Sequence, residues 1–156
     1  MSLYLALKFL HVIGAAILLG TGVGIAFFLY MADRYGDPPA IAATLRIVVI
    51  ADYFFTATAA IAQPVTGLLL AELGRYPLSQ TWLMASIVLY LVVGACWLPV
   101  VVLQIKMRDL AIAAVAAKQQ TLPPRYHQLR RAWFWLGWPA FISLLAIFWL
   151  MLATPT

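Results

Sequence analysis

Four long apolar stretches constrain the fold of this chain more than any other feature of its sequence. They cover residues 3–30, 41–73, 82–105 and 132–154. A helix needs about 20 consecutive apolar residues to cross the hydrocarbon core of a bilayer, and each stretch is long enough. The sequence therefore predicts an all-α fold, a four-helix transmembrane bundle that forms a single membrane domain over residues 1–156.

The composition agrees with a membrane protein and excludes other classes. Hydrophobic residues make up 65% of the chain and charged residues only 10%, whereas soluble domains carry about 25% charged residues. The net charge of +5 comes from basic residues that flank the apolar stretches, so it indicates contact with the lipid bilayer and no nucleic-acid partner. The single cysteine, Cys96, excludes an intrachain disulfide and is expected to serve packing.

Basic residues lie mostly on one side of the predicted membrane. That side has Arg34, Arg46, Lys106, Arg108, Lys118, Arg125, Arg130 and Arg131. The other side has only Lys8 and Arg75. The positive-inside rule therefore predicts that both termini are non-cytoplasmic and that residues 106–131 form a cytoplasmic helical extension and turn. The expected location is the inner (plasma) membrane of a bacterium, and His127 is expected at the surface of the basic segment.

The first apolar stretch carries two polar residues that need partners. Lys8 and His11 are three residues apart, so they project from nearly the same side of a helix. A charge at the membrane centre costs about 2.5–3.5 kcal/mol, and a membrane-buried histidine is a candidate functional residue. Glu72 is expected at the same outer end as a partner for Lys8. The alternatives are a Lys8 side chain that extends to the headgroups and a purely structural His11.

Polar residues recur at helical spacing on the second and third stretches. One row consists of Asp52, Thr56, Gln63 and Thr66, and the other of Ser86, Tyr90, Trp97, Gln104 and Arg108. A surface that faced lipid would not collect these groups, so we expect a polar seam between the first three helices. Pro64 predicts a kink whose freed carbonyl is satisfied by a neighbour.

Asp52 is expected in the cytoplasmic third of the membrane. There it lies within reach of Gln104, Arg108 or the Arg130–Arg131 pair, and a neutral carboxyl is the alternative. The fourth stretch presents bulky side chains instead of polar ones. Those expected to form an aromatic wall are Trp138, Ile142, Leu145 and Trp149.

Six short runs along the chain carry a resemblance to a known family. They are Leu7-Lys8-Phe9-Leu10-His11, Asp52-Tyr53-Phe54-Phe55-Thr56, Gln63-Pro64-Val65-Thr66-Gly67, Cys96-Trp97-Leu98-Pro99-Val100, Gln104-Ile105-Lys106-Met107-Arg108-Asp109 and Gly137-Trp138-Pro139-Ala140-Phe141. Along nearly its whole length the chain resembles a bacterial family of predicted integral membrane proteins classified as a domain of unknown function. The resemblance implies a membrane protein and brings no assigned activity.

The first stretch alone carries a second similarity. The run Lys8-Phe9-Leu10-His11, followed by small residues, is similar to the opening of HemJ-type protoporphyrinogen oxidases and of copper-resistance D membrane proteins. In the HemJ-type proteins this histidine is linked to haem b. The resemblance therefore implies that His11 is an axial ligand of haem iron.

The first functional hypothesis is a haem b-binding membrane protein with a redox role. His11 would bind the iron, and Lys8 or Arg75 would neutralise the propionates. The side chains expected to flank the macrocycle are Trp97, Trp138 and Trp149. The iron would then have His11 as its only protein ligand, or a sixth ligand would come from a second copy of the chain, paired through Gly20 and Gly24 on the first helix.

The second hypothesis is a non-enzymatic membrane component, either a small transporter or an accessory subunit of a larger complex. In this case the polar seam lines a narrow path or joins the helices by hydrogen bonds. The sequence contains no His/Cys/carboxylate cluster at metal-ligand spacing. The one candidate metal ligand is therefore His11, as a ligand of haem iron.

Overall fold

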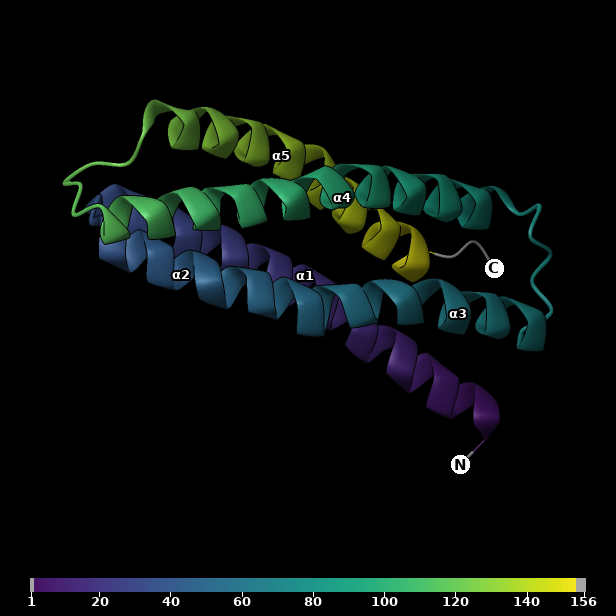
Figure 1. Ribbon diagram of the computed structural model, residues 1–156. Coiled ribbons are helices and arrows are strands. Elements are labelled where there is room, and N and C mark those ends of the chain that lie inside the picture. Colours follow the sequence, from purple (N-terminus) through teal and green to yellow (C-terminus); the bar gives the residue numbers. More distant parts are fainter. Residues whose placement is uncertain (1, 154–156) are drawn as a thin grey trace.

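The computed structural model describes residues 2–153, which form a bundle of long helices (Figure 1). The elements are α1 (Leu3–Tyr35), α2 (Pro38–Ala51), the π-helical turn η1 (Asp52–Thr56), α3 (Ala57–Leu73), α4 (Thr81–Ala116) and α5 (Pro124–Leu152). Because α2, η1 and α3 follow one another without a break, the bundle contains four rods, each long and apolar enough to cross a membrane. No strand occurs within residues 2–153. The predicted all-α class with four transmembrane helices is confirmed.

The rods differ from the predicted stretches mainly at their ends. The second rod begins at Pro38, before the predicted residue 41, and α4 continues beyond residue 105 to Ala116. The last predicted stretch ends at Thr154, which lies outside the described residues. A helix rises about 1.5 Å per residue, so rods of this length extend past a hydrocarbon core of about 30 Å.

A two-residue turn reverses the chain between α1 and α2. Gly36 has a φ of 73°, a conformation that glycine adopts without the steric cost of a Cβ, and it ends α1. The carboxylate of Asp37 then accepts a hydrogen bond from the backbone N–H of Ala40 at 3.2 Å. Pro38 occupies the first turn of α2, where no N–H is needed.

The buried apolar core lies at the end of the bundle where α1 and α2 join. Its most deeply buried members include Leu29, Leu45, Met107, Ala111 and Tyr126. At this end α4 packs against both α2 and α5. Toward the other end α1 packs against α3 and α4 packs against α5, and few contacts join the two pairs (Figure 1). The bundle is therefore closely packed at one end and separates into two helix pairs toward the other.

Large apolar side chains cover much of the outer surface of the four rods. Examples are Phe28, Tyr53, Ile61, Leu91 and Trp149, each exposed in the isolated chain. A water-soluble monomer rarely exposes such a continuous apolar surface. Together with the four spans, this surface is that of a multi-pass protein embedded in a lipid bilayer.

A tyrosine compensates for the proline inside α3. Pro64 has no backbone N–H, so the carbonyl oxygen of Ala60, four residues earlier, loses its helical hydrogen bond. The hydroxyl of Tyr90 on α4 donates a hydrogen bond to this oxygen. Tyr90 is thus the neighbour that satisfies the freed carbonyl. Its hydrogen bond also connects the two helix pairs in a region where few other contacts join them.

We expect Tyr90→Phe to lower the free energy of unfolding in detergent by about 1 kcal/mol, because it leaves the Ala60 carbonyl unpaired. In a Pro64→Ala background the same change should cost much less, because a backbone N–H at position 64 can bond to Ala60. The unmodified protein, the two single variants and the double variant form a double-mutant cycle. Chemical unfolding followed by circular dichroism measures the free energy of unfolding of all four. Equal costs in both backgrounds would contradict the assignment.

Candidate functional site

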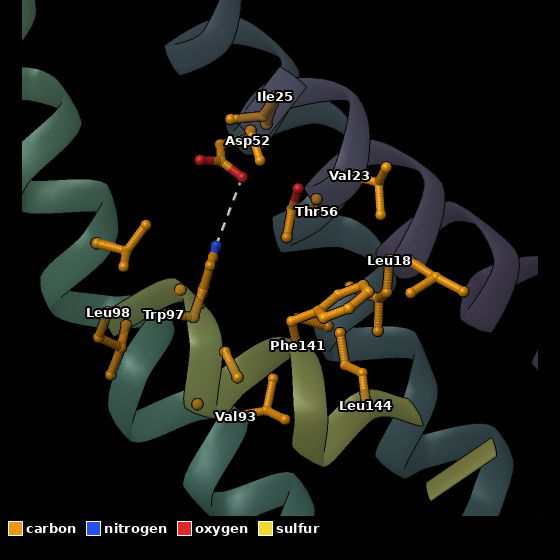
Figure 2. A pocket seen from close by; sticks show the side chains of 18 of the residues that line it. Leu18, Val23, Ile25, Asp52, Thr56, Val93, Trp97, Leu98, Phe141 and Leu144 are labelled. Carbon is orange, nitrogen blue, oxygen red and sulfur yellow. Dashed lines mark hydrogen bonds between the residues drawn. The ribbon is translucent and has the colours of Figure 1, made fainter. Parts of the chain in front are cut away.

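A large cavity lies between the two helix pairs. Its volume is about 690 Å³, and α1, η1, α3, α4 and α5 all contribute to its walls (Figure 2). Most lining side chains are apolar, and the exceptions include Asp52, Thr56, Tyr90, Trp97 and Gln104. Cavities of roughly 300–1,000 Å³ with apolar walls and a few polar groups are typical of small-molecule sites.

Asp52 is the most polar group of this cavity. Its side chain is only 4% exposed, and Trp97 Nε1 donates a long hydrogen bond of 3.5 Å to Asp52 Oδ1 (Figure 2). Thr56 and Gln104 lie beside the carboxyl. Gln104 is among the side chains predicted to reach Asp52, and the structure brings the two together.

Four side chains that line the cavity each have a buried polar atom with no hydrogen-bond partner within residues 2–153. The atoms are Asp52 Oδ2, Thr56 Oγ1, Gln104 Oε1 and Trp133 Nε1. Burying a polar atom without a partner costs free energy, so such atoms are rare in native proteins. Their gathering around one cavity indicates a place where a further molecule supplies the missing partners.

The π-helical turn η1 sets the position of the polar residues. The backbone N–H of Ala57 bonds to the carbonyl of Asp52, five residues earlier, so the turn is one residue wider than an α-helical turn. Asp52 and Thr56, the first and last residues of the turn, both line the cavity. Single π-helical turns inside α-helices frequently mark functional sites. No pattern in the sequence predicts this turn.

Seven aromatic side chains surround the cavity. They are Phe27, Tyr90, Trp97, Trp133, Phe134, Trp138 and Phe141. Of the aromatic wall predicted on the fourth helix only Trp138 lines the cavity. Ile142, Leu145 and Trp149 are exposed on the outside of α5, because the helix turns Trp133 and Phe141 inward instead.

His11 lies in a different place, on the contact between α1 and α3. His11 Nδ1 is 2.8 Å from Thr66 Oγ1, and Gln63 Nε2 donates a hydrogen bond of 2.7 Å to the His11 carbonyl oxygen. Two glycines allow the helices to approach: a Cβ at Gly14 would lie 2.6 Å from Gln63 Nε2, and one at Gly67 would lie 3.2 Å from His11 Cε1. Neither His11 nor Lys8 lines the large cavity.

The hydrogen bonds of the Thr66 hydroxyl are consistent with one tautomer of the histidine. The Thr66 hydroxyl donates to the Ala62 carbonyl at 2.8 Å, and a hydroxyl has only one proton. When that proton is donated to Ala62, Thr66 Oγ1 accepts a hydrogen bond from His11 Nδ1–H, and the neutral ring carries its lone pair on Nε2.

The predicted ion pairs are absent from residues 2–153, and others take their place. Lys8 and Glu72 are both exposed and form no salt bridge. Arg108 pairs instead with Asp109, the next residue in the sequence, at 2.8 Å. Asp52 is therefore not bridged by an arginine.

A further polar cluster lies at the closely packed end of the bundle. Tyr126 donates a hydrogen bond of 2.6 Å to Asp33 Oδ1, and Arg130 Nε lies 3.3 Å from Asp33 Oδ2. A second cavity of about 220 Å³ is lined by Asp33 and Arg130 and shares the wall residues Phe27 and Trp133 with the large one. Sequence reasoning missed this cluster, because Asp33 and Tyr126 are 93 residues apart.

Comparison with known proteins identifies the family of this chain. The family described as "Predicted integral membrane protein (DUF2269)" matches residues 5–155. The chain therefore belongs to this family. No curated protein and no solved structure matches the chain.

We expect Gly14→Leu to lower the free energy of unfolding by about 1–3 kcal/mol, since the larger side chain displaces Gln63 and separates α1 from α3. Gly20→Leu is the matched control, because a Cβ at Gly20 meets open space. Unfolding in detergent, followed by circular dichroism, measures both. Equal effects of the two substitutions would contradict the close contact at Gly14.

Proposed function

We propose that this member of the DUF2269 family binds a small amphipathic molecule within the membrane, as a non-enzymatic membrane component such as a small transporter or accessory subunit. One observation carries the proposal. Within residues 2–153, four side chains that line one apolar cavity each have a buried polar atom without a hydrogen-bond partner, and a ligand with a polar head and an apolar body suits such a lining.

The position of the cavity supports entry of the ligand from the lipid. Wall residues such as Phe27, Ile61 and Leu98 are exposed, so the cavity is not sealed by protein. A molecule dissolved in the acyl chains can therefore reach the cavity between the two helix pairs without crossing water. The closely packed core at the other end of the bundle blocks passage there.

The basic residues support a bacterial inner-membrane location with both termini outside the cytoplasm. In this orientation the closed end of the bundle, with the Asp33–Arg130 pair, faces the cytoplasm. The second cavity then lies on the cytoplasmic side of the first. A transporter would need to open this closed end, whereas an accessory subunit would not.

Binding of the neutral fluorophore N-phenyl-1-naphthylamine tests the proposal. Energy transfer from the cavity tryptophans to the probe should rise to saturation in detergent-purified protein. Gly94 lines the cavity and a Cβ there meets open space, so Gly94→Leu should fill part of the cavity and weaken binding by about tenfold.

The matched control is Ala95→Leu, which adds a side chain at the neighbouring exposed position outside the cavity lining. This variant should bind the probe as the unmodified protein does. The proposed binding site would be overturned if energy transfer to the fluorophore never saturates, or if it falls equally in both variants.

A second proposal, haem b binding with a redox role, is supported by the contact of His11 with Thr66. In the tautomer that donates Nδ1–H to Thr66, Nε2 has its lone pair available, the arrangement that metal-binding histidines adopt. The tryptophans expected to flank the macrocycle do not fit this site, because Trp97 and Trp138 line the cavity and His11 does not. Bound iron would supply one-electron chemistry, with His11 as its one ligand from this chain.

Pairing of two copies through α1 is a separate proposal. Gly20 is exposed, and a side chain at this position would meet open space. Gly24 lies one turn further along the same helix and is half-buried, so the two glycines form a small-residue strip that allows close approach of a second helix.

The visible spectrum of protein purified from haem-replete cells tests the haem proposal. We expect a Soret band that is lost in His11→Ala and retained in His127→Ala, whose side chain is exposed in the described structure. A colourless preparation, or a band that survives His11→Ala, would overturn it.

A further inference from the structure

From the charges around the large cavity we infer the class of its ligand: a lipophilic organic cation. The inference deepens the proposed binding function and rests on it. It is carried by a buried carboxyl that has no cationic partner and is surrounded by aromatic rings.

The cavity wall has one acidic group and no basic one. Among residues 2–153, Asp52 is the only aspartate or glutamate that lines it, and no lysine, arginine or histidine does. Two basic side chains close in sequence to its wall residues are engaged elsewhere, since Arg108 pairs with Asp109 and Arg130 pairs with Asp33. Lys106 and Arg131 are exposed and lie outside the cavity lining. A carboxylate in an apolar medium is costly without an opposite charge, and a cationic ligand is the partner that the chain does not provide.

The unpartnered oxygens increase this negative character. Asp52 Oδ2 and Gln104 Oε1 are both acceptors without a donor, and Gln104 is only 1% exposed. An anion would be repelled here, and an apolar molecule would leave both acceptors unpaired. A positive charge beside Asp52 interacts favourably with both oxygens.

The aromatic lining suits the same ligand. Tyr90, Trp97, Trp133 and Trp138 line the cavity together with three phenylalanines. The faces of aromatic rings attract cations, most strongly in tryptophan and most effectively where water is excluded. The apolar walls formed by residues such as Leu18, Val93 and Leu144 (Figure 2) accommodate the hydrocarbon groups of the ligand.

Two probe ions of nearly the same shape and opposite charge separate charge recognition from apolar binding. Tetraphenylphosphonium is a lipophilic cation, and tetraphenylborate is the matching anion. Each is titrated into the detergent-purified protein with bound N-phenyl-1-naphthylamine, and displacement of the fluorophore is measured against protein-free micelles. We expect the cation to displace the probe at a concentration at least about tenfold lower than the anion.

Asp52→Asn removes the charge and keeps the shape of the side chain. We expect the displacing concentration of tetraphenylphosphonium to rise about tenfold in this variant, with binding of the neutral fluorophore retained. Asp109→Asn is the matched control, because that carboxylate is exposed and lies outside the cavity lining, and it should leave displacement by the cation unchanged.

The outcomes distinguish this inference from the function on which it rests. Preference for the cation, lost in Asp52→Asn, supports both. Equal displacement by the two ions, or a cation preference that survives Asp52→Asn, overturns the cation inference while binding of the neutral fluorophore upholds the proposed function. If the fluorophore itself does not bind saturably, both are overturned. The two ions compared on the unmodified protein decide the question even if Asp52→Asn does not fold.

Discussion

The structure depends on one constraint: a polar group inside the hydrocarbon region must find a partner within the protein or in a ligand. Several of the polar residues find such a partner on a neighbouring helix. Tyr90 satisfies the carbonyl that Pro64 frees, and Thr66 and Gln63 engage His11 across the contact of α1 with α3. Asp52 is different, because its best contact is a long hydrogen bond from Trp97 and one of its oxygens has no partner in the described chain. In the cavity beside Asp52, a bound ligand would supply the partner that the protein does not provide.

The distribution of packing explains why the cavity exists. Apolar residues of α1, α2, α4 and α5 form a continuous core at the end where α1 and α2 join. Beyond that core, α1 stays with α3 and α4 stays with α5, so the two pairs separate. The wider turn at η1 brings Asp52 and Thr56 to the point of separation. A closed end thus holds the bundle together while the open end provides space for a ligand.

The sequence predicted the four spans and the membrane class because apolar length and helical spacing are local properties. Asp37 and Pro38 at the start of α2 are equally local signals. Helical spacing also grouped Asp52, Thr56, Gln63 and Thr66 on one side of a helix. It could not show that a wider turn lies at Asp52 and Thr56, or that these four residues belong to two different sites. Thr66 contacts His11, whereas Asp52 and Thr56 line the cavity. The rotation of α5, which turns Phe141 inward and Trp149 outward, and the distant contact of Asp33 with Tyr126 depend on tertiary packing that spacing does not encode.

The most direct test is an electron cryo-microscopy structure of the protein in lipid nanodiscs with tetraphenylphosphonium added. We predict density for one ion inside the cavity, with its charge next to the Asp52 carboxyl and its rings against the aromatic side chains. A cavity collapsed by approach of the two helix pairs, with the Asp52, Thr56 and Gln104 side chains hydrogen-bonded to one another and no ion between them, would contradict the account.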